Sequence, residues 1–159
     1  MPTLQEIADK LEIMDLPTAY ANAIDSGNWD ALDDVFTPDA YIDYRQMGGP
    51  DGKYPAIKEY LRTRLPDFPN YMHLVGNVTV KVTGDTATGR TACFNPMEME
   101  LKDGSRQVFF CGLWYADKYV RTPKGWRFSE RVEEQCYFHN VPAELTAQIE
   151  RDKEAGSKS

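Results

Sequence analysis

The stretch VFFCGLWYADKYVRTPKGWRF, residues 108–128, carries two strands and the turn between them. Its first part, 108–115, is apolar on both faces, which is typical of a strand covered on both sides in the centre of a sheet. The Pro-Lys-Gly at 123–125 is a turn signal. We therefore predict a hairpin of two strands, 105–122 and 126–138, in an antiparallel sheet.

Three more strands precede this hairpin. Residues 71–83 contain valines at positions 78, 80 and 82 that alternate with polar residues, the pattern of a half-buried antiparallel strand. A Gly-Asp turn leads to a strand over 86–101, and the Asp-Gly at 103–104 is a strong hairpin signal before the next strand. A short strand rich in Tyr and Ile is predicted at 40–47.

The segments outside these strands are predicted to contain four helices. Thr3 and Glu6 fit a capping box that opens the first helix, and Pro17 predicts a kink or a restart near residues 15–16. Asn28 is the expected N-cap of a second helix, which the Thr-Pro-Asp at 37–39 ends. Further helices are expected at 54–65 and 142–153, followed by a loose tail at 155–159.

Helices first and hairpins afterwards indicate the α+β class. The expected architecture is a cone-shaped barrel, in which N-terminal helices and one curved mixed or antiparallel sheet enclose a single apolar pocket. The length of 159 residues suggests a single domain over 1–159, with a core at about 5–140 and a C-terminal tail at 141–159.

Charge and composition exclude several classes of protein. With 18 Lys and Arg against 25 Asp and Glu, the net charge of −7 argues against nucleic acid or a membrane as partner. The N-terminus is polar and acidic, unlike a signal peptide, and the longest nearly apolar run, 108–116, is too short to span a bilayer.

The cysteines and standard motifs narrow the chemistry further. Cys93, Cys111 and Cys136 form no CxxC or zinc spacing, and we expect them to be reduced, buried thiols in a cytoplasmic protein. The glycine-rich cofactor motifs and the GxSxG motif are absent, so no metal, cofactor or covalent nucleophile is expected.

His73 is the first candidate for acid–base chemistry. It is one of only two histidines, and it is predicted to lie inside strand 71–83 between Met72 and Leu74. An imidazole in such apolar surroundings can exchange protons near neutral pH. The alternative is a core histidine that only bonds to the backbone, and both interpretations stay open at this point.

Asp25 is the natural partner of that histidine. An acid at the C-terminal end of a helix opposes the helix dipole, and a buried acid needs a partner. Tyr20, five residues earlier, lies about 140° round the helix. Both can border one cavity only if the helix end lies over its mouth or the last turn unwinds. The alternative for Asp25 is an exposed acid near a helix end.

Asn95 is predicted to share a strand face with two apolar residues, Cys93 and Met97. A buried amide must be satisfied by a ligand or by the protein. Pro96, directly after it, indicates a bulge or a sheet edge.

In four pieces the sequence resembles the SnoaL-like branch of the nuclear transport factor 2-like superfamily. These are YANAID at 20–25, NWDALDDVFTPDA at 28–40, the histidine of NYMHLVGN at position 73, and GLWYADKYVRTPKGWRFSER at 112–131. The branch includes scytalone dehydratase, bile-acid 7α-dehydratase and hexachlorocyclohexane dehydrochlorinase. The resemblance covers about residues 5–140. It implies a cone-shaped barrel around one deep pocket, often assembled as a homotrimer or homodimer.

The resemblance also implies roles for individual residues. Asp25 and His73 match the proton-transfer pair of these enzymes, and Tyr20 matches a tyrosine beside the aspartate. Asn95 falls where bile-acid dehydratase has an aspartate and scytalone dehydratase an asparagine. Either Tyr41 or Tyr44 would be a second tyrosine that holds the substrate.

Two positions fit the family pattern loosely. A basic residue on the last strand of some relatives corresponds to Arg131, unless Gln135 occupies that place. His139 comes too late in the chain to be the second pocket histidine of scytalone dehydratase.

The sequence thus predicts a cofactor-independent lyase, a dehydratase-type enzyme that acts on a small hydrophobic hydroxy-carbonyl compound. His73 would remove the proton α to the carbonyl, and Asp25 would hold the imidazole. The alternatives are an isomerase or polyketide-cyclase-type enzyme with the same pair, and a noncatalytic ligand-binding or assembly module.

Overall fold

The computed structural model describes residues 1–156, so residues 157–159 of the predicted tail lie outside the described residues. In chain order the elements are α1 (Leu4–Asp25), η1 (Trp29–Asp34), β1 (Phe36–Asp43), η2 (Arg45–Met47), β2 (Asp51–Lys53), α2 (Tyr54–Arg64), η3 (Leu65–Asp67), β3 (Asn70–Tyr71), β4 (Leu74–Thr83), β5 (Thr86–Glu100), β6 (Arg106–Thr122), β7 (Gly125–His139) and α3 (Ala143–Gly156). Elements labelled η are 3₁₀ helices.

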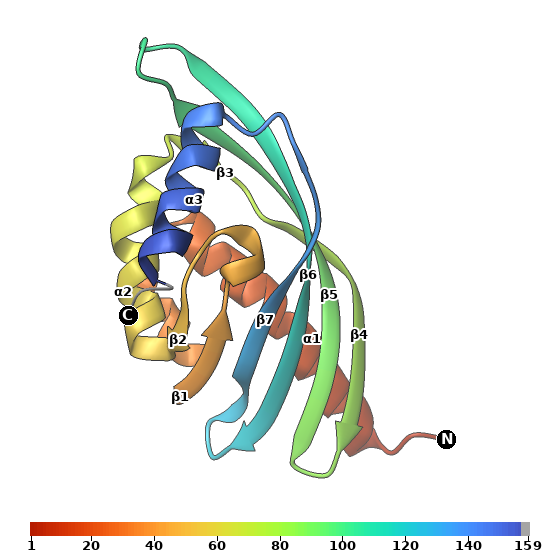
Figure 1. The fold of residues 1–159 in the computed structure, drawn as a ribbon. Helices are drawn as coiled ribbons and strands as arrows, with labels where there is room; N and C mark the ends of the chain where they lie inside the picture. The colour runs from red at the N-terminus through yellow and green to blue at the C-terminus, as the bar shows by residue number, and fades with distance from the viewer. Residues whose placement is uncertain (157–159) are drawn as a thin grey trace.

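One curved sheet holds the strands in the order β2-β1-β7-β6-β5-β3, and β4 also pairs with β5. The predicted hairpin is confirmed, because β6 lies between β5 and β7. β1 runs parallel to β7, so the sheet is mixed. Figure 1 shows the long strands β4 to β7 curving together, with α1 and α2 on the same side of the sheet. The sheet does not close, and the predicted α+β class with N-terminal helices is confirmed.

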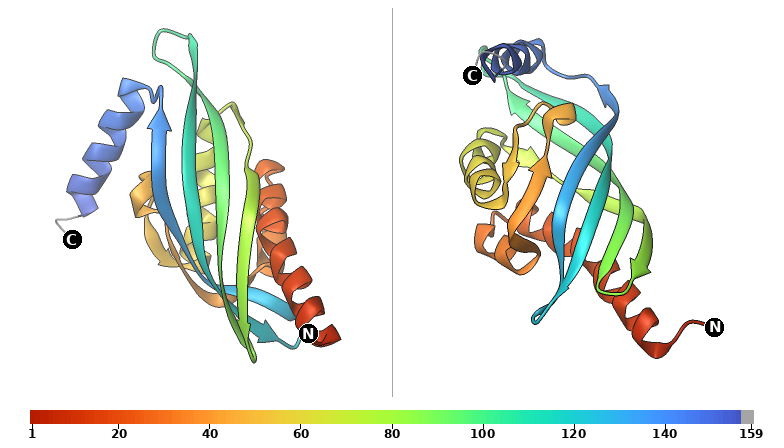
Figure 2. Two further views of the ribbon diagram at one scale, coloured as in Figure 1. Left: turned by 90° about the vertical axis from the view of Figure 1, so that its right-hand side faces the viewer. Right: turned by 60° about the horizontal axis from the view of Figure 1, so that its bottom comes forward.

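The core lies between the inner face of the sheet and the helices α1 and α2 (Figure 2). On β6 the odd-numbered side chains point inward and are buried, from Phe109 to Tyr119. Ile13, Leu16 and Ile24 of α1 pack against this face. The alternation of buried and exposed residues along β6 therefore defines the inner and outer faces of the whole sheet.

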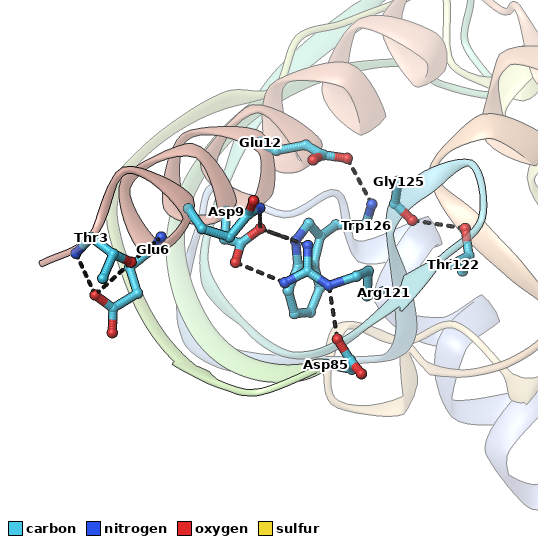
Figure 3. A network of polar contacts seen from close by, with 10 residues as sticks. Thr3, Glu6, Asp9, Glu12, Asp85, Arg121, Thr122, Gly125 and Trp126 are labelled. Atoms are coloured by element: carbon cyan, nitrogen blue, oxygen red, sulfur yellow. Dashed lines mark hydrogen bonds and ion pairs between the residues drawn. The ribbon is translucent and has the colours of Figure 1, made fainter.

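A network of polar contacts fixes α1 to the β6–β7 hairpin (Figure 3). Asp9 accepts from both terminal nitrogens of Arg121, each at 2.7 Å, and from the indole N–H of Trp126 at 3.1 Å. Hydrogen bonds from Arg121 hold the pKa of Asp9 far below its usual range. Glu12 accepts the backbone N–H of Trp126 at 2.7 Å. The helix that ends at Asp25 is thus anchored to the sheet at its other end.

Two predictions about the N-terminal region were wrong in part. The expected restart at Pro17 is absent, because α1 runs without interruption to Asp25, although its capping box forms as predicted. The expected second helix is only the 3₁₀ helix η1, and Asn28 makes no side-chain cap. Phe36 instead opens β1 and packs against the rings of Tyr54 and Phe128. Core packing of Phe36 therefore overrides the local helical spacing.

Cys93 and Cys111 are buried free thiols, as predicted, whereas Cys136 is exposed. Cys136 was misplaced because the register of β7 against β6 shifts at Gly112 and Leu113, directly beside it. Among residues 1–156, no helix has both the length and the apolar character needed to cross a membrane.

Candidate functional site

The end of α1 and the break between β3 and β4 bring Asp25 and His73 together. Nδ1 of His73 lies 2.6 Å from Oδ1 of Asp25, and the backbone N–H of His73 donates to Oδ2 at 2.8 Å. An ionised carboxylate only accepts, so Nδ1 carries the proton and Nε2 is the nitrogen left free to accept one. Nε2 has no hydrogen bond within the described residues. The pair thus holds one basic nitrogen in a defined direction.

His73 does not lie inside a strand, as the sequence predicted, but in the two-residue gap between β3 and β4. The cause is Pro96 on β5. The backbone N–H of Met72 donates to the carbonyl of Pro96 at 3.2 Å, but proline has no N–H to return. The side-chain amide of Asn95 fills this place and donates to the carbonyl of Met72 at 2.9 Å. The N–H of the next residue, His73, points away from β5, because successive N–H groups along a strand alternate in direction, and it donates to Asp25.

Tyr71 joins this segment to α1 from the other side. Its hydroxyl donates to the backbone carbonyl of Ile24 at 3.3 Å, and its ring meets that of His73 edge-on. The last turn of α1 and the His73 segment are therefore connected by three side chains, those of Asp25, Tyr71 and His73.

Tyr20 and Tyr44 form a second pair, in which the hydroxyl oxygens lie 2.6 Å apart. Both side chains are buried, and burial raises the pKa of each hydroxyl. They therefore remain neutral hydrogen-bond donors. The hydroxyl of Tyr20 is bonded to Tyr44 rather than to Asp25 or His73.

Of the two tyrosines left open by the sequence, only Tyr44 lies in the interior. Tyr41 points away from it, because Ala40 and Ile42 on either side are buried in the core. The Tyr41 hydroxyl donates to Asp51 at 2.7 Å.

Arg131 lies in the core and not at an open surface. Two of its nitrogens donate to the carboxylate of Asp117, each at 2.8 Å, and both side chains are fully buried. Burial alone would lower the pKa of the guanidinium. The carboxylate of Asp117 outweighs this effect, so the pKa of Arg131 is raised above its ordinary value. Its guanidinium carbon also lies 4.3 Å from the ring centre of Tyr20. Arg131 therefore packs against the ring of Tyr20 inside the core.

Gln135, the other candidate on the last strand, is exposed although it lies opposite Leu113 on the inner face. Its backbone N–H donates to the side chain of Gln46 at 3.0 Å.

Sequence reasoning missed Glu133, which lies between Arg131 and Gln135 on the inner face. It is paired in register with Tyr115, whose side chain is fully buried. Burial raises the pKa of its carboxyl to about 8. The signal was present in the sequence, because side chains two residues apart on a strand share a face.

Two cavities lie away from the Asp25–His73 pair. One, of about 430 Å³, is lined by residues such as Thr37, Lys81 and Ser129. The other, of about 470 Å³, lies on the outer face, where Phe94 and Trp114 line it. Partly buried apolar side chains pack against the core from several elements, among them Tyr60, Phe68, Tyr71, Val75, Met97 and Met99. Among residues 1–156, no three or more His, Cys, Asp and Glu side chains gather in a way that could hold a metal ion.

The sequence profile of the SnoaL-like domain matches residues 5–132. An uncharacterized protein of Mycobacterium tuberculosis is 55% identical over 138 residues, which cover 86% of this chain and 92% of that protein.

Two solved structures share the cone-shaped fold. A protein of Kribbella flavida matches with a TM-score of 0.76 at 24% identity, over 84% of this chain and 94% of that chain. Hexachlorocyclohexane dehydrochlorinase of Novosphingobium barchaimii matches with a TM-score of 0.74 at 21% identity, over 88% of this chain and 94% of that chain.

Proposed function

The chain belongs to the SnoaL-like domain family, as its sequence predicted, and on that premise we propose that it is a cofactor-independent lyase. The reaction is a dehydratase-type elimination from a small hydrophobic hydroxy-carbonyl compound. The observation that carries this proposal is the double contact between Asp25 and His73, through the ring and through the backbone. A structural neighbour named a dehydrochlorinase supports the reaction class.

In this mechanism Nε2 of His73 removes the proton on the carbon next to the carbonyl. Asp25 accepts from Nδ1, which fixes the tautomer and stabilises the imidazolium that forms. The electrons of the C–H bond form the new double bond and the C–O bond on the next carbon breaks. The imidazolium of His73 can return its proton to this hydroxyl, which then leaves as water.

The Tyr20–Tyr44 pair supplies a neutral donor for the carbonyl oxygen as it becomes an enolate. One well-placed donor of this kind lowers the barrier by about 3 kcal/mol. Asn95 and Arg131 act through their neighbours in this proposal: Asn95 positions the His73 segment, and Arg131 supports Tyr20.

The test uses the aldol adduct of acetone and benzaldehyde, a β-hydroxy ketone, in deuterated water. Proton removal is followed as deuterium uptake next to the carbonyl, and elimination as formation of the enone. Wild-type protein is expected to catalyse both, and His73→Ala neither. His139→Ala is the matched control, since His139 is the only other histidine and is exposed.

Three results would contradict the proposal. The first is enone formation by His73→Ala at the wild-type rate. The second is deuterium uptake without loss of water, which favours the isomerase or cyclase alternative because the product keeps its mass. The third is neither reaction in wild-type protein, which favours a noncatalytic binding or assembly role.

A further inference from the structure

We propose that Glu133 is a second acid–base residue of this site, which gives its proton to the leaving hydroxyl while His73 takes a proton from carbon. The inference rests on the proposed elimination and adds a catalytic residue to it. Three observations support it: the place of Glu133 on the sheet, the groups around its carboxyl, and its lack of a partner.

Glu133 lies on the inner face of β7. The cross-strand pairs Tyr115–Glu133 and Asp117–Arg131 lie side by side in the register, and Tyr115, Asp117 and Arg131 are buried. Glu133 itself is only half-buried, unlike Arg131 two residues earlier. Along the inner face of β7, exposure thus increases from the buried Arg131 through Glu133 to the exposed Gln135.

The charge of Glu133 raises the pKa of six groups on different elements of the fold. They are Tyr20 of α1, Tyr44 after β1, Tyr60 of α2, Cys93 of β5, and Cys111 and Tyr115 of β6. Asp43 of β1 and Arg131 of β7 act on Glu133 in turn. Arg131 is the only cation in this set, and its bonds go to Asp117.

No hydrogen bond or ion pair engages the Glu133 carboxyl within residues 1–156. A carboxylate that is partly removed from water without a hydrogen-bond or ion-pair partner costs free energy. Burial raises the pKa of Glu133 to about 8, so near neutral pH the group is largely a neutral carboxylic acid that can donate a proton. Isolated, perturbed acids of this kind are typical of functional sites.

Glu133 and the Asp25–His73 pair act on a common region. Burial raises the pKa of the Cys93 thiol to about 12, and the charges of Glu133 and Asp25 both contribute to that rise. Both carboxyl groups therefore lie within electrostatic reach of one inner-face thiol. We therefore place the substrate over Cys93 in the proposed complex.

The proton balance of the step is simple. Nε2 of His73 gains the proton from carbon, the C–O bond breaks, and the oxygen takes the proton of Glu133 to leave as water. The site then holds an imidazolium and a carboxylate, and it resets when one proton moves from His73 to Glu133 through water.

The experiment compares two probes that give the same enone. One is the acetone–benzaldehyde aldol adduct, whose hydroxide needs a proton to leave; the other is its p-nitrophenyl ether, whose phenolate leaves without one. Glu133→Gln is expected to slow elimination from the alcohol about 100-fold or more and to change that from the ether less than about threefold. His73→Ala is expected to abolish both.

Glu134→Gln is the matched control, because it removes the same charge one residue away. Glu134 lies on the outer face and bonds to Arg90 at 2.8 Å, so its variant should behave as wild type. Equal rates of wild type and Glu133→Gln on the alcohol would overturn the inference. So would an equal loss on both probes, which indicates a structural role.

Carbon-13 NMR of labelled glutamate carboxyls measures the protonation of Glu133 without any substrate. We expect one carboxyl that titrates near pH 8 and is missing from Glu133→Gln. A midpoint for Glu133 at the ordinary value for glutamate overturns the inference whatever the rates. Wild-type protein that converts neither probe contradicts the proposed function itself, and Glu133 then has no leaving group to protonate.

Discussion

The side-chain amide of Asn95 donates to the backbone carbonyl of Met72 at 2.9 Å, in the place of the N–H that Pro96 lacks. One ladder bond of the sheet is thereby exchanged for a side-chain bond. The exchange lies between β3 and β4, and the N–H of the next residue, His73, points away from β5 and reaches Asp25. The base of the proposed reaction thus lies beside an irregular step of the sheet, where the Asn95 bond holds its segment.

We expect Asn95→Ala to lower turnover of the aldol adduct by about 10- to 100-fold, because small displacements of a catalytic group have effects of this size. Pro96→Ala in the same chain should restore much of the loss, since an alanine N–H can donate to the carbonyl of Met72. Turnover and the imidazole nitrogen shifts of His73 in the single and double variants check this. A double variant no better than Asn95→Ala contradicts the assignment.

Local patterns predicted most of the sheet. The turn residues at 103–104 and 123–125 placed the ends of β5, β6 and β7 to within one residue. The alternating valines at 78, 80 and 82 identified β4, but the predicted strand 71–83 is divided into β3 and β4. Residues 28–36 were predicted as a helix because their apolar spacing is helical. Phe36 contacts Phe128, which is far away in sequence, and no local pattern contains that information.

The candidate site, too, was predicted only in part. The family resemblance indicated the Asp25–His73 pair, and the structure brings the two side chains together. Pro96 signalled an irregularity, but the Asn95 bond that uses it depends on the register of two strands. Glu133 was missed because Arg131 and Gln135 were considered by alignment alone, without following the face of the strand.

Asp25→Asn should reduce turnover by about 10³- to 10⁴-fold while the fold is kept, because an amide no longer fixes the tautomer of His73. Enone formation measures the loss, and circular dichroism checks the fold. Asp15→Asn, an exposed acid on the same helix, is the control and should leave turnover unchanged. Full activity of Asp25→Asn would reduce Asp25 to a helix-end acid that anchors the His73 segment.

Arg131→Met should lower the free energy of unfolding by about 3–5 kcal/mol, because it leaves the buried carboxylate of Asp117 without a counterion. Adding Asp117→Leu should recover most of that loss. Lys118→Met breaks the neighbouring exposed pair with Glu130 and should cost less than about 1 kcal/mol. Urea unfolding of wild type, Arg131→Met, the double variant and Lys118→Met measures these free energies. Equal losses for Arg131→Met and Lys118→Met would contradict the prediction.

The outer face of the sheet exposes large apolar side chains, with Leu74 at 61%, Tyr137 at 44% and Phe94 at 38%. Contiguous apolar surface of this kind usually contacts another protein. We expect a second copy of this chain there, in a homodimer or homotrimer. Phe94→Lys should shift sedimentation toward the monomer, and Thr79→Lys on β4 should not. A wild-type protein that sediments as a monomer at micromolar concentration would contradict this.

Glu133 also makes stability depend on pH in a direction that can be tested. Its pKa is about 8 in the folded chain and ordinary, near 4.5, in the unfolded chain, so the folded form binds more protons between these values. Stability from this group is therefore full at the acid end and falls as pH rises toward 8, by at most about 1.4 kcal/mol per pH unit. Glu133→Gln removes the effect. Urea unfolding at about pH 5, 7 and 9 should thus show the variant gaining on wild type as pH rises, while Glu134→Gln shows no such trend. A wild-type–variant difference that is the same at all three pH values would mean that the Glu133 carboxyl is ionised like any surface glutamate.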